Sequence, residues 1–183
     1  MKITRQFIRN LVMILGILVL LSYLYGVSKS DDATALWGGI PLSWTKFIVP
    51  WMFVAAVGYL MYWWTILYSV DVPVIENLRW PWKESDGKGA NRLLLAYCLF
   101  LIPSMLWLES TQFHMNNDYS WTPLLVIGIL VLVSIGNIMF GMLAYSAYQD
   151  RVEGSGTMLV GSIMLSIQCI LFDGILWNIK FPW

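Results

Sequence analysis

Residues 119–149 read YSWTPLLVIGILVLVSIGNIMFGMLAYSAYQ, a run of 31 residues without Asp, Glu, Lys or Arg. A helix needs about 20 mostly apolar residues to cross the hydrocarbon core of a bilayer, so this run is long enough for one crossing. Inside lipid the backbone must satisfy its own hydrogen bonds, and a helix does so within a single segment. The stretch therefore predicts a transmembrane helix over residues 123–148.

Four further uncharged runs of 16 to 24 residues lie between the remaining clusters of charge. The 183-residue chain is 58% hydrophobic and only 12% charged, whereas soluble domains carry about 25% charged residues. We therefore expect an all-α, polytopic protein embedded in a lipid bilayer, with one domain over residues 1–183. Its five transmembrane helices are predicted near residues 7–26, 47–70, 93–108, 123–148 and 157–178.

Lysine and arginine residues predict the orientation of these helices. If the N-terminus is inside, three basic residues fall on the outer side, Lys29, Lys46 and Lys180. The other eight then fall on the inner side, namely Lys2, Arg5, Arg9, Arg79, Lys83, Lys88, Arg92 and Arg151. Short cytoplasmic loops carry an excess of basic residues, so this count predicts an inside N-terminus and an outside C-terminus.

Composition also narrows the classes of function. A net charge of zero gives no support for nucleic-acid binding. The two cysteines, Cys98 and Cys169, fall within predicted helices, which excludes a disulfide framework or a CxxC site. The single histidine, His114, has only Glu109 and Asp118 near it in sequence, and transition-metal sites usually need more nitrogen or sulfur ligands. We therefore expect no metal site and no catalytic triad, and predict that the protein is not an enzyme.

Polar residues inside the predicted helices point to buried faces. An ionisable group within a span is costly, so Asp173 is predicted to avoid lipid and to be hydrogen-bonded or charge-paired across a helix interface or cavity. At roughly 100° per residue it shares one face with four other residues, in a stripe whose successive spacings are four, three, four and four. That predicted stripe is Ser162, Ser166, Cys169, Asp173 and Trp177. A second stripe predicts close helix packing, formed by Ser134, Asn137, Gly141, Ala144 and Tyr148.

Five short motifs suggest a family. The sequence reads PLSWT at 41–45, PWMF at 50–53, WTILY at 64–68, SMLW at 104–107 and DGILWNI at 173–179. In this order, and with five short-looped helices, they resemble the TspO/translocator protein family, the tryptophan-rich sensory proteins. In the last two motifs, serine and aspartate stand where that family has asparagine.

The resemblance implies a receptor-like pocket among the helices that binds a flat apolar ligand such as a porphyrin or a sterol. Large rings would line this pocket and Asp173 would anchor a polar group, as in apolar ligand sites with few polar groups. The candidate ligand-binding residues are Trp51, Phe53, Tyr62, Trp64, Tyr68, Ser104, Trp107, Asp173 and Trp177. Trp51 and Trp64 lie about 220° apart on a straight helix, so Trp51 pairs better with Tyr62, about 20° away, and Trp64 is expected to face lipid or a partner.

Two other functions fit the same residues. Minimal loops and helices rich in small and aromatic residues are also typical of a non-catalytic accessory subunit, in a homodimer or a larger membrane complex. A proton- or ion-coupled transporter would rest on Asp173 and Glu109 alone, whereas transporter sites pair several polar groups with broken helices.

Overall fold

The computed structural model describes residues 3–30, 32–117 and 119–183, and it contains only helices and loops over these residues. Five helical spans are long and apolar enough to cross a membrane, which confirms the all-α fold class and makes the chain an integral, multi-pass membrane protein. The first four are α1 (Arg5–Lys29), α2 (Leu42–Trp64), α4 (Gly89–Asn117) and α5 (Thr122–Gln149). The fifth begins as α6 (Ser155–Ser166).

Two of the spans change helix type along their length. The second continues from α2 into a π-helical turn, η2 (Thr65–Ser69). The fifth continues from α6 into an eleven-residue π-helix, η3 (Ile167–Trp177), and ends in the short α7 (Asn178–Lys180). Two short elements lie in loops, the 3₁₀ turn η1 (Ala35–Trp37) and the helix α3 (Val72–Asn77).

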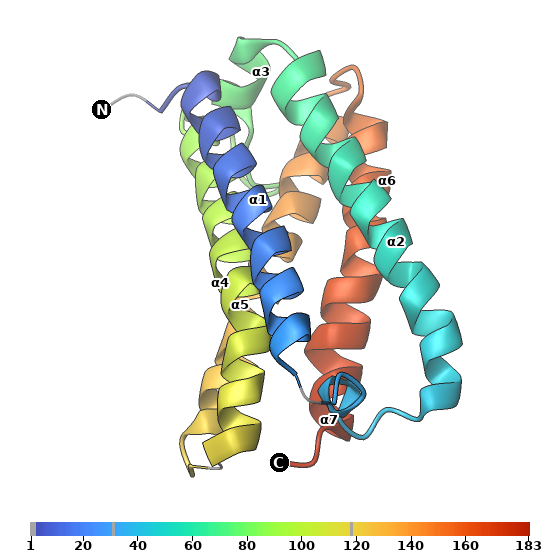
Figure 1. The fold of residues 1–183 in the computed structure, drawn as a ribbon. Coiled ribbons are helices and arrows are strands. Elements are labelled where there is room, and N and C mark those ends of the chain that lie inside the picture. The colour runs from blue at the N-terminus through green and yellow to red at the C-terminus, as the bar shows by residue number, and fades with distance from the viewer. Residues whose placement is uncertain (1–2, 31, 118) are drawn as a thin grey trace.

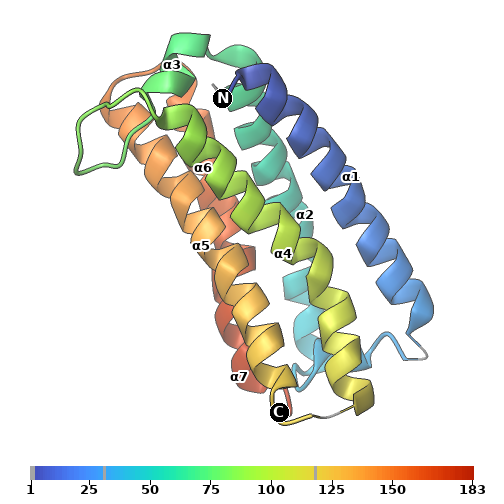
Figure 2. The same cartoon turned by 90° about the vertical axis from the view of Figure 1, so that its left-hand side faces the viewer.

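The spans form one bundle with the chain termini at opposite ends (Figure 1). Helices α4 and α5 pack side by side, α1 packs against α4, and α6 packs against both α2 and α5 (Figure 2). We call the end that holds the start of α1 and all of α3 the N-terminal end. The opposite end, which holds η1 and α7, is the C-terminal end.

Small residues allow the helices to approach closely. A Cβ atom placed on Gly58 in α2 would lie 2.6 Å from the carbonyl oxygen of Gly161 in α6. A Cβ on Gly136 in α5 would lie 2.7 Å from the backbone nitrogen of Phe100 in α4. Such contacts matter in lipid, where close packing rather than exclusion of water holds helices together. Asn137, from the predicted packing stripe, is fully buried, and Ser166 of α6 donates to its side-chain oxygen at 3.5 Å.

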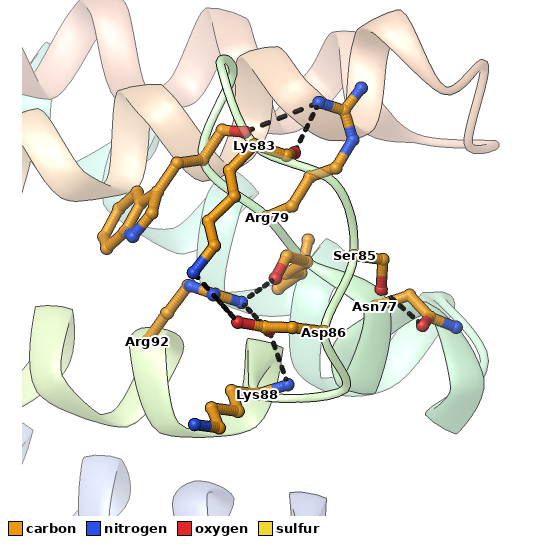
Figure 3. A network of polar contacts seen from close by, with 9 residues as sticks. Asn77, Arg79, Lys83, Ser85, Asp86, Lys88 and Arg92 are labelled. Atoms are coloured by element: carbon orange, nitrogen blue, oxygen red, sulfur yellow. Dashed lines mark hydrogen bonds and ion pairs between the residues drawn. The ribbon is translucent and has the colours of Figure 1, made fainter.

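Ion pairs fix the long loop at the N-terminal end, and Figure 3 shows the one between Asp86 and Arg92. Arg79 donates to both carboxylate oxygens of Asp150 at 3.0 and 2.7 Å, which ties the loop to the end of α5. Arg92, in the first turn of α4, donates to both oxygens of Asp86 at 2.8 and 2.6 Å and to the carbonyl of Leu78 at 3.0 Å. The Arg92 guanidinium holds the pKa of the Asp86 carboxyl well below its usual range.

The third span is longer than its sequence predicted. Residues 109–117 were predicted to form a polar loop, but they continue α4 as helix to Asn117. Tertiary hydrogen bonds satisfy the polar groups there: Gln112 donates to the carbonyl of Gly26 in α1 at 2.5 Å. Buried His114 has its Nδ1 atom 2.7 Å from the Thr122 hydroxyl of α5. The second span likewise begins earlier than residue 47, at Leu42.

Candidate functional site

The aromatic side chains inside the bundle form two groups. We call the first the tyrosine cluster; it lies between α2, α4 and α5 and consists of Tyr59, Tyr62, Tyr97, Phe100 and Phe140. We call the second the tryptophan cluster; it lies at the C-terminal end and consists of Tyr23, Trp107, Trp177, Phe181 and Trp183. The two groups differ in their polar surroundings.

Phe140 is the centre of the tyrosine cluster. Its ring centroid lies 4.9 Å from that of Tyr62, 4.8 Å from that of Tyr97 and 5.6 Å from that of Phe100. These rings are buried, and the hydroxyl groups of Tyr62 and Tyr97 have no hydrogen-bond partner. No charged side chain belongs to this group, so its contacts are those of a packed helix interface.

The tryptophan cluster joins α1, α4 and η3. The ring of Trp107 meets Tyr23 edge-on at 6.1 Å and Trp177 edge-on at 5.7 Å, measured between ring centroids. Trp177 is buried, packs on Phe181 at 4.5 Å and donates from its indole nitrogen to the carbonyl of Leu36 at 3.0 Å. Rings from three spans therefore converge at this end of the bundle, and the hydrogen bond of Trp177 joins them to the η1 turn.

Asp173 lies in η3 four residues before Trp177, and its carboxylate accepts a hydrogen bond from Gln168 at 2.9 Å. The π-helix explains this pair, because its backbone hydrogen bonds join residues five apart and so bring residues 168 and 173 to one side. Within the described ranges, no lysine or arginine forms an ion pair with Asp173.

Several buried polar atoms near this end have no hydrogen-bond partner. They include the indole nitrogen of Trp107, one carboxylate oxygen of Glu109, and the side-chain oxygens of Gln168 and Asn178. Buried polar groups are normally paired, and unpaired ones call for a specific explanation. Donors and acceptors without protein partners thus occur on the two spans, the third and the fifth, that carry Trp107 and Trp177.

The structure brings together two of the nine candidate residues, Trp107 and Trp177. A third, Asp173, lies about one turn before Trp177 on the same span. Ser104 lies one turn before Trp107, where it is buried and donates to the carbonyl of Phe100 at 2.6 Å. Tyr62 belongs to the tyrosine cluster instead.

The other four candidates lie on the second span and do not join the tryptophan cluster. Phe53 and Trp64 face outward, with 69% and 57% of their surface exposed. Trp64 stacks on Tyr68 at 4.9 Å on the outer surface of the bundle, and Trp51 is half-buried on α2.

Two residues of this site and the helix type that positions them were not predicted from the sequence. Tyr23 was not selected as a candidate, although a tyrosine inside an apolar span is a signal of an internal contact. Gln168 was missed because five residues do not share a face in an α-helix. The predicted Asp173 stripe assumed α-helical periodicity, which ends at Ser166. The hydrogen bond of Asp173 is also within its own span, not across an interface as predicted.

No group of three metal-binding side chains occurs within residues 3–30, 32–117 and 119–183. Asp118, one member of the weak sequence cluster around His114, lies outside the described residues. Two surface hollows of about 200 and 510 Å³ open at the N-terminal end, along the end of α5, and contain none of the nine candidate residues. Comparisons with family models, curated proteins and solved structures found no match for this chain.

Proposed function

We propose that this protein binds one small, largely apolar molecule at the tryptophan cluster, within the membrane and without catalysing a reaction. The observations that carry this proposal are the edge-on contacts among the rings of Tyr23, Trp107 and Trp177 and the position of Asp173 about one turn before Trp177 on the same span. Small-molecule sites are mostly apolar and aromatic, with a few polar groups that fix the ligand's orientation. A half-buried carboxylate that accepts only one hydrogen bond from a neutral amide supplies such a group.

The carboxylate discriminates between the two ligand types that the TspO resemblance implies. A sterol hydroxyl can donate a hydrogen bond to Asp173 while its rings pack on the indoles. The carboxyl groups of a natural porphyrin are a poorer match, because carboxyl groups brought together out of water disfavour one another's ionised form. A sterol-like ligand therefore suits the tryptophan cluster better than a porphyrin.

The charges along the chain support an orientation with this site in the outer half of the bilayer. Seven of the basic residues predicted to lie inside are described and belong to the N-terminal end: Arg5, Arg9, Arg79, Lys83, Lys88, Arg92 and Arg151. Cytoplasmic ends of membrane proteins are enriched in lysine and arginine. A reporter enzyme fused after Trp183 should be active only if moved to the outer side; activity in the cytoplasm would contradict this orientation.

The accessory-subunit function has its own supporting observation. Gly58 and Gly161 hold α2 and α6 in backbone contact, which leaves no room for a ligand between these two spans at that level. The stacked rings of Trp64 and Tyr68 face outward and offer a surface to a partner helix. Mild detergent purification from the native membrane separates the two functions, because a subunit co-purifies with stoichiometric partners.

Ligand binding can be tested by energy transfer from tryptophan to dehydroergosterol, a fluorescent sterol, in lipid nanodiscs. We expect saturable transfer in the native protein. Trp107→Leu should weaken the affinity by about fivefold, since it removes the ring that contacts both Tyr23 and Trp177. Trp64→Leu, the matched control on the outer surface, should leave the affinity unchanged. Absence of saturable transfer, or equal losses in the two variants, would contradict binding at this cluster.

A further inference from the structure

The larger of the two surface hollows has a lining rich in hydrogen-bond donors. It has a volume of about 510 Å³ and lies beside the turn from α5 to α6, which is at the N-terminal end of the bundle (Figure 1). Six residues line it: Tyr145, Tyr148, Gln149, Arg151, Val152 and Ser155. Guanidinium, amide and phenol groups all donate hydrogen bonds, and no carboxylate belongs to this lining. The hollow therefore suits a negatively charged group that accepts hydrogen bonds.

Arg151 occupies a backbone position that glycine usually takes. Helix α5 ends in a Schellman motif, in which the backbone N–H of Arg151 donates to the carbonyl of Tyr148 at 3.1 Å. The second bond of the motif runs from the N–H of Val152 to the carbonyl of Ala147 at 3.0 Å. Arg151 is its left-handed residue, with a φ of 55°, and no other non-glycine residue in the described part of the chain has a positive φ. An arginine kept at such a position points to a use for its side chain.

The guanidinium of Arg151 is the one that the protein leaves unpaired within residues 3–30, 32–117 and 119–183. The other four arginines donate to protein groups: Arg5 to the Val70 carbonyl, Arg9 to Gln6, Arg79 to Asp150 and Arg92 to Asp86. Glu153 follows Arg151 by two residues, but it does not line the hollow and forms no ion pair with Arg151. The positive charge at the hollow is therefore available to a ligand.

The hollow opens onto the outer, lipid-facing surface of α5. Ile138 precedes Tyr145 by seven residues, so the two lie on one face of the helix about two turns apart, and both side chains are exposed. Tyrosine is typical of the boundary between membrane and water. A lipid with its headgroup in the hollow can extend its acyl chains along this face, whereas a soluble phosphate ester has no chains to place there.

We propose that the larger hollow binds the headgroup of an anionic phospholipid, with the phosphate on the guanidinium of Arg151 and the acyl chains along the outer face of α5. Guanidinium groups bind phosphate through two parallel N–H donors. A headgroup with an ammonium, as in phosphatidylcholine, finds no carboxylate in the lining, so phosphatidylglycerol suits the hollow better. The proposed orientation places this end at the cytoplasmic leaflet, where anionic lipids are concentrated. The site lies at the end of the bundle opposite the tryptophan cluster and does not depend on ligand binding there.

Native mass spectrometry of the purified full chain in detergent can test this site. It measures the affinity of the first bound molecule of phosphatidylglycerol and of phosphatidylcholine with the same acyl chains. We expect phosphatidylglycerol to bind about fivefold more tightly. Arg151→Gly should weaken phosphatidylglycerol binding by about fivefold and leave phosphatidylcholine binding within about twofold. Equal affinities of the native protein for the two lipids would contradict the proposal.

Two controls separate this site from general charge and from a role of Arg151 in folding. Lys88→Gln removes one exposed positive charge at the same end, outside the hollow, and an equal loss of affinity there would overturn the proposal. Glycine adopts the left-handed conformation readily, so Arg151→Gly should denature in sodium dodecyl sulfate at the native midpoint or above it. A lower midpoint would assign Arg151 to holding the fold together and would also overturn the proposal.

A soluble competitor distinguishes a lipid from a free phosphate ester. Glycerophosphoglycerol is the headgroup of phosphatidylglycerol without its acyl chains. At about a hundredfold molar excess it should leave the lipid bound, because it makes no contact along α5. Displacement of the lipid would show that the hollow takes free phosphate esters and would overturn the assignment to a phospholipid.

Discussion

The tyrosine cluster and the tryptophan cluster are built from similar rings but differ in what surrounds them. Phe140 collects three rings within 5.6 Å of its own in a buried, uncharged interface. Trp177 also sits among rings, but it lies one turn from a carboxylate and beside buried polar atoms that lack partners. Both clusters hold buried polar atoms without partners. The difference teaches that neither rings nor unpaired polar atoms alone identify a ligand site, and that the nearby carboxyl group of Asp173 is what sets the tryptophan cluster apart.

The largest expected effect is on stability, at the centre of the tyrosine cluster. Phe140→Ala removes a buried ring that contacts three others and should cost about 3–5 kcal/mol of unfolding free energy. Phe53→Ala is the control, because Phe53 faces outward. Both are measured by denaturation with sodium dodecyl sulfate in mixed micelles. A loss below about 1 kcal/mol for Phe140→Ala would show that this cluster is not the packing centre.

A smaller loss is expected in the tryptophan cluster. Trp177→Phe keeps an aromatic ring but removes the hydrogen bond to the Leu36 carbonyl, which should cost about 1–2 kcal/mol. Trp64→Phe, on the outer surface, should change stability by less than about 0.5 kcal/mol. If Trp177→Phe proves as damaging as Phe140→Ala, the tryptophan cluster is a packing centre too, and the contrast between the clusters disappears.

The unpaired hydroxyls of the tyrosine cluster provide a sharper test. Tyr62→Phe removes a buried group without a partner, so stability should stay within about 1 kcal/mol of the native protein or rise. The same denaturation assay applies, with Tyr97→Phe as a second variant of the same kind. A loss above about 2 kcal/mol in either variant would mean that these hydroxyls are hydrogen-bonded, and the tyrosine cluster would then resemble the tryptophan cluster in polarity.

The smallest expected effect is on stability at low pH. It involves the loop that leads into α4, the helix that carries Tyr97 and Phe100. Arg92 lowers the pKa of Asp86 in the folded state, so the pair stabilises the fold above the ordinary aspartate pKa. That contribution is lost as the pH falls through the lowered pKa. Asp86→Asn should therefore be less stable than the native protein at pH 7, and the two should converge as the pH is lowered below about 4. Glu153→Gln, an exposed change at the same end, should show no such convergence.

The spans could be predicted because the length of an uncharged, apolar run is read directly from the sequence and does not depend on contacts with other parts of the chain. The continuation of α4 over residues 109–117 was not, because Gln112 and His114 are satisfied by residues distant in sequence. The outward position of Trp64 followed from its angle to Trp51 on a straight helix. Tyr62 could not be placed by angle alone, since its partner Phe140 lies on another span.

The site was only partly predictable for a related reason. Asp173, Trp107 and Trp177 could be selected as a polar anchor and large rings. The structure brings the two indoles into contact and places Asp173 about one turn before Trp177. Gln168 could not, because its contact with Asp173 requires π-helical geometry that a periodicity of 3.6 residues excludes.

The eleven-residue π-helix has a mechanical consequence for the last span. A π-helix has more residues per turn than an α-helix, so each residue of η3 turns through a smaller angle than each residue of α6, which precedes it in the same span. If η3 became α-helical, the residues that follow it would rotate about the helix axis. They include Phe181, which lies against Gly38. Deleting a single residue within η3 would likewise rotate the part of the span that follows the deletion relative to the rest of the bundle. The number of residues per turn in η3, and not only the types of its residues, therefore sets the direction in which Asp173 and Trp177 face.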